Sequence, residues 1–162
     1  IGECRALMAE LTPPLLYEVG LGPALRAMAE HCGQLHGVPI EVEEDEHSKP
    51  LDESRRGLLF QAGRELVANA LKYAGDCSIR VCFLRDGDEI CLEVRDTGRG
   101  FDPADVDRGA SDSTEGGFGL FNIRERLQSL GGRLELDSAP GRGTTAAIRI
   151  PIAEDAEGET AE

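Results

Sequence analysis

One hairpin constrains the fold of this chain more than any other feature. Two segments in which apolar and polar residues alternate, 78–84 and 89–96, flank a short turn that contains Asp86-Gly87. Asp-Gly is favoured in tight turns whose twist matches that of two antiparallel strands. The sequence therefore predicts an antiparallel pair with one apolar face, which a second layer must cover.

Helical patterns on both sides of this pair supply the second layer. Apolar residues at helical spacing predict three helices, at 23–35, 52–74 and 120–130. Shorter alternating runs predict further strands at 38–42, 133–137 and 144–150. This order predicts an α/β (α+β) two-layer sandwich, in which a mixed, largely antiparallel sheet carries its helices on one face.

Charge and cysteine content argue against several classes of function. The formal net charge of the 162 residues is −14, so we expect no direct binding to nucleic acid or to an anionic membrane surface. The five cysteines show neither CxxC nor Cys/His metal spacing, and we expect them to be reduced. No signal peptide and no apolar run near ~18 residues is present, which favours a cytoplasmic domain. Whether the full-length protein carries a membrane anchor elsewhere is left open.

The helix expected at 52–74 carries a narrow polar stripe. On a helical wheel, Glu65, Asn69 and Lys72 fall within about 60° of one another. A carboxylate, an amide oxygen and an ammonium group arranged in this way can hold a hydrated Mg²⁺ and a phosphate chain. The same spacing also fits an ordinary solvated helix face, and the stripe alone does not decide between them.

Two polar residues are expected on the apolar face of the sheet. Asp96 follows three apolar residues on the inward side of 89–96, and Thr144 begins the inward side of 144–150. If these strands pair antiparallel, Asp96 and Thr144 meet at one end of the sheet. The carboxylate could accept a hydrogen bond from an adenine amino group, or from local backbone N–H groups in a turn.

Two glycine clusters lie in or beside the long stretch 97–117. Gly98 and Gly100 follow Asp96, and 116–119 precede the last expected helix. Glycines before a helix allow backbone N–H groups to face an anion, although they fit a flexible loop equally well. No GxxxxGK[ST] and no strand–GxGxxG–helix unit occurs, which argues against a P-loop and a Rossmann fold.

In combination these segments resemble the GHKL ATPases, which include DNA gyrase and the histidine kinases and share the Bergerat ATP-binding fold. RELVANALKYA at 64–74 resembles the N box, DTGRGF at 96–101 the G1 box, GFGL at 117–120 the G2 box, and Gly143-Thr144 the final element. GLFNIRERL at 119–127, together with 5–25, resembles the two-component sensor histidine kinases that pair with NarL-type response regulators.

The resemblance implies roles for individual residues. Asn69 would ligate Mg²⁺ with Glu65 assisting through water, and Lys72 would contact phosphate; these three are the implied catalytic residues. The implied ATP contacts are Asn69, Lys72, Tyr73, Asp96, Gly98, Gly100, Gly117, Phe118, Gly119, Leu120 and Thr144. Many members of the subgroup have His where Tyr73 lies. Residues 102–115 would form a lid over ATP.

The resemblance also implies a domain organisation and a reaction. Residues 1–20 would be the end of a dimerisation helix and a linker, 21–152 the ATPase domain, and 153–162 an acidic disordered tail. In a homodimer, the domain would pass the γ-phosphoryl group of ATP to a histidine on the dimerisation domain, for relay to an aspartate of a response regulator.

The phosphoacceptor histidine is expected to lie outside this chain. None of His31, His36 and His47 lies in a His-Asp or His-Glu helical motif of the family's kind. Two alternatives stay open: an anti-sigma-factor serine kinase of the same fold, and a module that binds nucleotide only to regulate partners.

Overall fold

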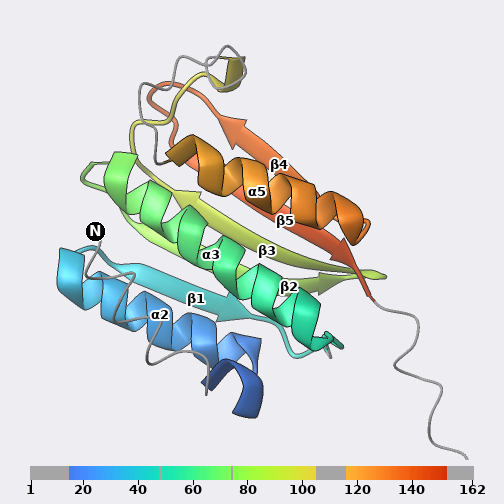
Figure 1. The fold of residues 1–162 in the computed structure, drawn as a ribbon. Helices are drawn as coiled ribbons and strands as arrows, with labels where there is room; N and C mark the ends of the chain where they lie inside the picture. Colours follow the sequence, from blue (N-terminus) through green and yellow to red (C-terminus); the bar gives the residue numbers. More distant parts are fainter. Residues whose placement is uncertain (1–14, 48, 74, 105–115, 153–162) are drawn as a thin grey trace, which may run out of the picture.

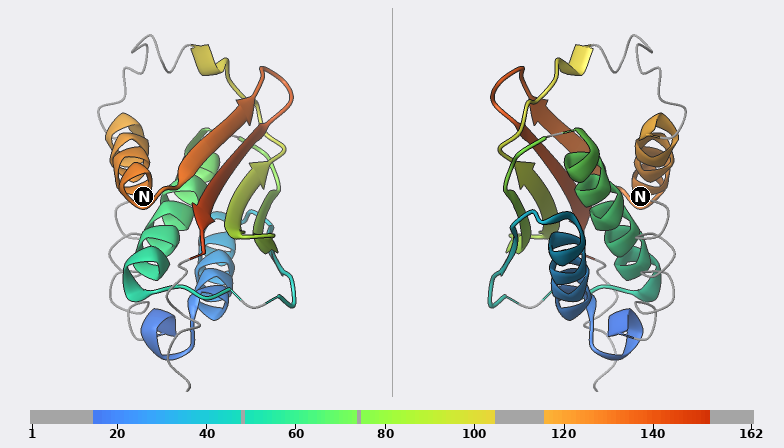
Figure 2. Two further views of the ribbon diagram at one scale, coloured as in Figure 1. Left: turned by 90° about the vertical axis from the view of Figure 1, so that its right-hand side faces the viewer. Right: turned by 90° about the vertical axis from the view of Figure 1, so that its left-hand side faces the viewer.

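The architecture is a five-stranded sheet with its helices on one face (Figure 1). The computed structural model describes residues 15–47, 49–73, 75–104 and 116–152. Its strands are β1 (Ile40–Glu44), β2 (Ile79–Asp86), β3 (Glu89–Asp96), β4 (Arg133–Ser138) and β5 (Thr144–Pro151). Its main helices are α2 (Leu21–His36), α3 (Glu53–Tyr73) and α5 (Gly116–Ser129). Figure 2 shows the two layers from the side, so the predicted sandwich is confirmed.

The sheet is mixed, with the strand order β1-β2-β3-β5-β4. β1 and β2 are parallel, and the other three pairs are antiparallel. Parallel neighbours need a crossover connection, and α3 provides it between β1 and β2. The predicted hairpin joins β2 to β3, and Gly87 adopts the left-handed φ of 61° that such a turn favours.

The core lies between the inward face of the sheet and the helices. Side chains that alternate along each strand are fully buried there, among them Val81, Leu92 and Ile148. α3 crosses this face closely at Gly63, where a Cβ atom would lie 3.1 Å from Leu92 Cδ2 and 3.2 Å from Leu25 Cδ2. A glycine inside a helix costs about 1 kcal/mol relative to alanine, and the close packing of α2, α3 and β3 explains its presence.

Two element boundaries differ from the sequence prediction. α2 begins at Leu21 and continues to His36, where Gly37 ends it in the left-handed conformation. β1 begins at Ile40 rather than at residue 38, because the Val38 N–H is used by the helix end, where it donates to Gly33 O at 3.2 Å.

The segment before α2 contributes to the core. Leu16 is 4% exposed and packs with the apolar residues of α2 and α3. No helix in the described part of the chain is long and apolar enough to cross a membrane.

The outward face of the sheet carries charged side chains that pair across strands. Arg133 Nη1 lies 2.5 Å from Glu89 Oε1, and Arg149 Nη1 lies 3.1 Å from Asp86 Oδ2. Cys82 lies among such side chains and is nevertheless buried. Burial, together with the nearby carboxylates of Glu43 and Glu93, raises the pKa of the Cys82 thiol to about 11. The cysteines of the described ranges are free thiols.

Candidate functional site

Asp96 and Thr144 lie opposite each other at one end of the sheet, as the sequence predicted. The strand register pairs Asp96 with Thr144, and Thr144 in turn with Ser138 at the end of β4. All three side chains are on the inward face. Asp96 and Ser138 are each 7% exposed and are the buried polar or charged residues of the described chain. The ends of three strands therefore form a polar patch at the edge of an apolar core.

The Asp96 carboxylate is held in place by one of its two oxygens. Oδ1 accepts a hydrogen bond from Gly98 N at 2.9 Å, so the local turn considered from the sequence does form. Within the described residues, Oδ2 accepts no hydrogen bond. The turn and a ligand contact are therefore compatible, because each uses a different oxygen of the same carboxylate. The negative charge of Asp96 also affects a neighbouring thiol. Burial, followed by the carboxylates of Asp96 and Asp76, raises the pKa of Cys77.

The loop after β3 packs tightly on the turn between β4 and β5. Gly100 has a φ of +64°, and a Cβ atom there would lie 2.0 Å from Ala139 O. Gly141 N donates to Arg99 O at 2.6 Å, which joins the same two segments. Gly100 was implied as an ATP contact, and the structure shows a second reason for glycine here, because the turn leaves no room for a side chain.

Ser138 is a site residue that the sequence analysis missed. Its Oγ accepts a hydrogen bond from Phe101 N at 2.9 Å and lies 3.1 Å from Gly143 O and 2.8 Å from Thr144 Oγ1. The alternation that placed Asp96 and Thr144 inward also applies here, since Leu134 and Leu136 point inward before it. The predicted strand ended one residue too early to include it.

The polar stripe of α3 reaches the same end of the sheet. α3 and β3 run in the same direction, and Gly63 lies against Leu92 (Figure 1). From there Asn69 is about 9 Å and Lys72 about 14 Å further along the helix, and Asp96 is about 13 Å further along the strand. The last turns of α3 therefore lie level with Asp96.

The stripe faces α5 rather than open solvent alone. Gln61, one turn before Glu65, accepts a hydrogen bond from Arg126 of α5 at 2.6 Å. Glu65 and Asn69 are half-buried, and Lys72 is exposed. The carboxylate oxygens of Glu65 and the amide oxygen of Asn69 therefore lie on half-buried residues. Such oxygens are better suited to bind a ligand than those on an ordinary solvent-exposed helix face.

The second glycine cluster forms the first turn of α5 and does not precede the helix. α5 begins at Gly116, four residues earlier than the predicted start at Leu120. Apolar periodicity missed this turn because it contains three glycines. The first N–H groups of a helix have no partner within it and carry its positive end, so Gly117 and Gly119 place backbone donors there. The side chains of Tyr73 and Phe118, and residues 105–115 of the expected lid 102–115, lie outside the described residues.

Leu120 serves the core as well as the site. It is half-buried and packs against the cluster that includes Ile123 and Leu127 of the same helix. The apolar face of α5 therefore fixes how the helix lies on the sheet, and with it the direction in which its first N–H groups point.

The residues present fit magnesium that is bound together with phosphate. Asn69 and Glu65 offer hard oxygen donors, which suit this ion. Across the described ranges, no group of three or more His, Cys, Asp or Glu side chains is placed to hold a metal. Mg²⁺ commonly uses one or two protein oxygens and takes its other ligands from phosphate and water. The donor set matches that mode of binding.

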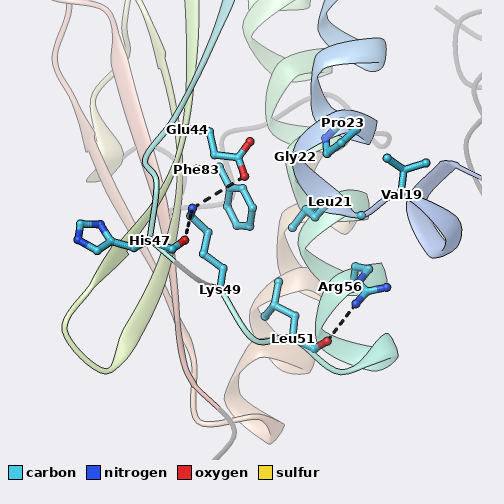
Figure 3. Close-up of a pocket in the computed structure, with 11 residues that line it drawn as sticks. Val19, Leu21, Gly22, Pro23, Glu44, His47, Lys49, Leu51, Arg56 and Phe83 are labelled. Carbon is cyan, nitrogen blue, oxygen red and sulfur yellow. Dashed lines mark hydrogen bonds and ion pairs between the residues drawn. The ribbon is translucent and has the colours of Figure 1, made fainter. Parts of the chain in front are cut away.

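A hollow of about 200 Å³ lies at the other end of the domain, where β1 ends and α2 and α3 begin (Figure 3). Lys49 extends along it with a side chain only 5% exposed, 2.5 Å from Asp45 Oδ1 and 5.0 Å from the centre of the Phe83 ring. Burial alone would raise the pKa of Asp45, but hydrogen bonds from Lys49, Arg85 N and His47 hold it well below its usual range. These contacts anchor the loop 45–51, and none of the predicted site residues lines this hollow.

Known proteins resemble this chain in sequence and in fold. The family model described as "Histidine kinase-, DNA gyrase B-, and HSP90-like ATPase" matches residues 54–154. A sensor-like histidine kinase of Chloroflexus aurantiacus is 37% identical over 93% of this chain, and the oxygen sensor histidine kinase NreB of Staphylococcus carnosus is 29% identical over 94%. The matched regions span 25% and 42% of those two proteins.

Among solved structures, the histidine kinase domain of the blue-light activated kinase EL346 of Erythrobacter litoralis has a similar fold. It superposes with a TM-score of 0.70 over 93% of this chain and 74% of that one, at 23% identity. Because the family model matches more than half of its length, the chain belongs to the histidine kinase-, DNA gyrase B- and HSP90-like ATPase family.

Proposed function

We propose that this domain is the ATP-binding catalytic part of a sensor histidine kinase and that its nucleotide lies at the Asp96 end of the sheet. One observation carries the placement. Asp96 is a buried carboxylate with one oxygen fixed by Gly98 and the other not engaged by the described residues. That second oxygen is not fully enclosed, so a ligand can reach it, and the amino group of adenine is a hydrogen-bond donor that suits it.

The remaining residues suit a triphosphate. The first turn of α5 offers backbone N–H groups at the positive end of a helix, and Lys72 is an exposed ammonium group on the stripe that faces α5. Asn69 would hold Mg²⁺ directly, and Glu65 would orient one of its waters. When bound, the ion neutralises phosphate charge and supports transfer of the γ-phosphoryl group. The contribution of the chain is to position the nucleotide and to compensate its charge.

The acceptor histidine lies, in this proposal, on an upstream dimerisation domain of a homodimeric parent protein. His31 is half-buried on α2, while His36 and His47 are exposed at the end of α2 and in a loop. The relatives' description as sensor histidine kinases supports the relay to a response regulator, and GLFNIRERL at 119–127 supports a NarL-type one. We place the domain in the cytoplasm, where ATP and such regulators are available.

The boundary between the ATPase domain and the linker is part of this proposal. The sequence suggested residue 20, but Leu16 already packs in the core. We therefore propose that the linker ends before Leu16.

Calorimetry on one variant tests the site. Asp96→Asn keeps the shape of the side chain but removes its charge and places an amide where the adenine amino group would donate. We expect the variant to remain folded by circular dichroism and to lose measurable Mg·ATP binding. Asp88→Asn is the matched control, because Asp88 is exposed in the hairpin at the other end of the sheet. Unchanged ATP affinity in Asp96→Asn would refute the site.

A chemical property of the product tests the reaction. In the parent protein, incubation with labelled ATP should produce a phosphoryl group that is stable in base and labile in acid, as expected of phosphohistidine. An acid-stable phosphoester would instead support a serine kinase of the same fold.

A further inference from the structure

We propose that Ser138 is a positioning residue that orients the hydroxyl group of Thr144 as a hydrogen-bond acceptor and thereby helps the site to select adenine over guanine. The inference rests on the proposed nucleotide site. It concerns a residue that makes no contact with nucleotide itself and acts through its neighbours.

The hydrogen-bond geometry around Ser138 supports one arrangement of protons. A serine hydroxyl has one proton to donate and two lone pairs that accept. Phe101 N–H, which can only donate, occupies one lone pair, and Gly143 O, which can only accept, is the natural partner for the Ser138 proton. The second lone pair then remains for Thr144, whose oxygen lies 2.8 Å away. All three contacts are satisfied together only when Thr144 donates its proton to Ser138.

This arrangement determines what Thr144 can offer to a ligand. Its only proton is directed toward Ser138, so its free lone pairs are acceptors. Thr144 lies beside Asp96 in the strand register, and the free Asp96 oxygen is an acceptor as well. Two neighbouring acceptors match the exocyclic amino group of adenine, directly or through water. The carbonyl oxygen of guanine at the same ring position would face two acceptors and no donor, which costs binding energy.

Ser138→Ala removes the hydrogen bonds with Phe101 N and Gly143 O, but other contacts still hold the same segments together. Gly141 N still donates to Arg99 O, and the β4–β5 pairing through Ser138 and Thr144 is made by the backbone. Loss of the hydroxyl group frees the Thr144 proton, which can then rotate toward a ligand carbonyl. The predicted effect is therefore a change in base preference rather than a general loss of binding.

The test compares the affinities of Mg·ADP and Mg·GDP in Ser138→Ala by calorimetry. We expect the preference for ADP over GDP to fall by about tenfold, the equivalent of one hydrogen bond gained for guanine, because the Thr144 hydroxyl group can still accept from adenine. In a Thr144→Val background, Ser138→Ala should leave the preference unchanged, because no hydroxyl group remains to be oriented. Ser129→Ala is the matched control, since its hydroxyl group bonds Arg126 O at the far end of α5.

The outcomes separate the two proposals. An unchanged ADP preference in Ser138→Ala, or an equal loss of affinity for both nucleotides, would overturn the role of Ser138 and leave the nucleotide site standing. Absence of ADP binding to the unaltered domain would overturn both. If Ser138→Ala does not fold, Thr144→Val alone decides: an unchanged preference there refutes the inference, and a reduced preference supports it.

Discussion

Replacing Gly143 with alanine adds one methyl group at the point where β5 begins. The Cβ atom would lie 2.2 Å from the backbone oxygen of Asp96, far inside van der Waals contact, and the residue has a φ of +75°. Gly141, two residues earlier in the same turn, has a φ of +79° but no atom within 4 Å of its Cβ position. The two alanine variants therefore share the backbone strain and differ only in the clash with Asp96.

The expected losses of stability follow from the backbone strain and from the clash with Asp96. A left-handed conformation costs an L-residue about 1–2 kcal/mol, and part of this is offset because alanine restricts the unfolded chain. We expect Gly141→Ala to lower the free energy of unfolding by about 1 kcal/mol. Relief of the clash at Gly143 requires a backbone shift and adds about 2 kcal/mol, for a total of about 3 kcal/mol. For a domain of this length, the melting temperature should fall by about 3 °C and about 9 °C respectively.

Urea unfolding gives the stability of both variants, and calorimetry gives their affinity for Mg·ADP. Gly143→Ala should also weaken ADP binding, because the shift displaces Asp96 and Thr144, whereas Gly141→Ala should bind normally. If the two variants are equal in stability and in ADP affinity, the close contact between the β4–β5 turn and the end of β3 is wrong, and the reasoning fails.

Three further predictions concern other parts of the domain. Asp45→Asn should lower the free energy of unfolding by about 2 kcal/mol at pH 7, because nearly buried Lys49 loses its charged partner. The pKa of Asp45 is lowered in the fold, so its contribution is present above the ordinary Asp pKa of about 4 and is lost as the pH falls below that value. Urea unfolding at pH 7 and pH 3.5 should therefore show a smaller difference at the lower pH. Arg126→Met should cost about 1 kcal/mol through the lost bond to Gln61 and should weaken ADP binding, measured by calorimetry, because α5 is less firmly held. The Cys82 thiol should resist alkylation at pH 7.5 in the folded domain and react after unfolding, as mass spectrometry of its peptide can show.

Each of these predictions has a result that would contradict it. Glu43→Gln is the control for Asp45, since its side chain is exposed, and equal destabilisation by both changes would remove the special role of the Lys49 contact. A stability difference for Asp45→Asn that grows toward acid pH would reverse the assigned sign. Normal ADP affinity in Arg126→Met would show that α5 is held by apolar packing alone. Rapid alkylation of Cys82 in the folded state would contradict its burial.

Residues that alternate along a strand were the most informative part of the sequence. The inward positions of Asp96 and Thr144 followed from the apolar residues beside them, and the structure places the two opposite each other. Ser138 escaped notice because it occupies the last position of its strand, where alternation has no following residue to confirm it. Its importance depends on Phe101 and Gly143, which are brought to it by tertiary packing and not by the local sequence.

Other differences arose where local preference and packing disagree. Three glycines at the start of α5 are poor helix formers, yet the helix includes them. The sequence predicts Lys49 to be a surface residue of a polar loop, yet its ammonium group lies over the Phe83 ring and its charge is compensated by Asp45. In both cases the deciding contacts come from residues distant in sequence, so periodicity and composition could not reveal them.

The central claim is that nucleotide binds at the end of the sheet formed by Asp96, Ser138 and Thr144. A titration of the ¹⁵N-labelled domain with Mg·ADP, followed by NMR, tests it most directly. The account predicts that the largest shifts fall on 96–101, 138–144, the last turns of α3 and the first turn of α5. Shifts that instead gather around Lys49, Phe83 and the start of α2 would place the nucleotide at the opposite end and contradict the account.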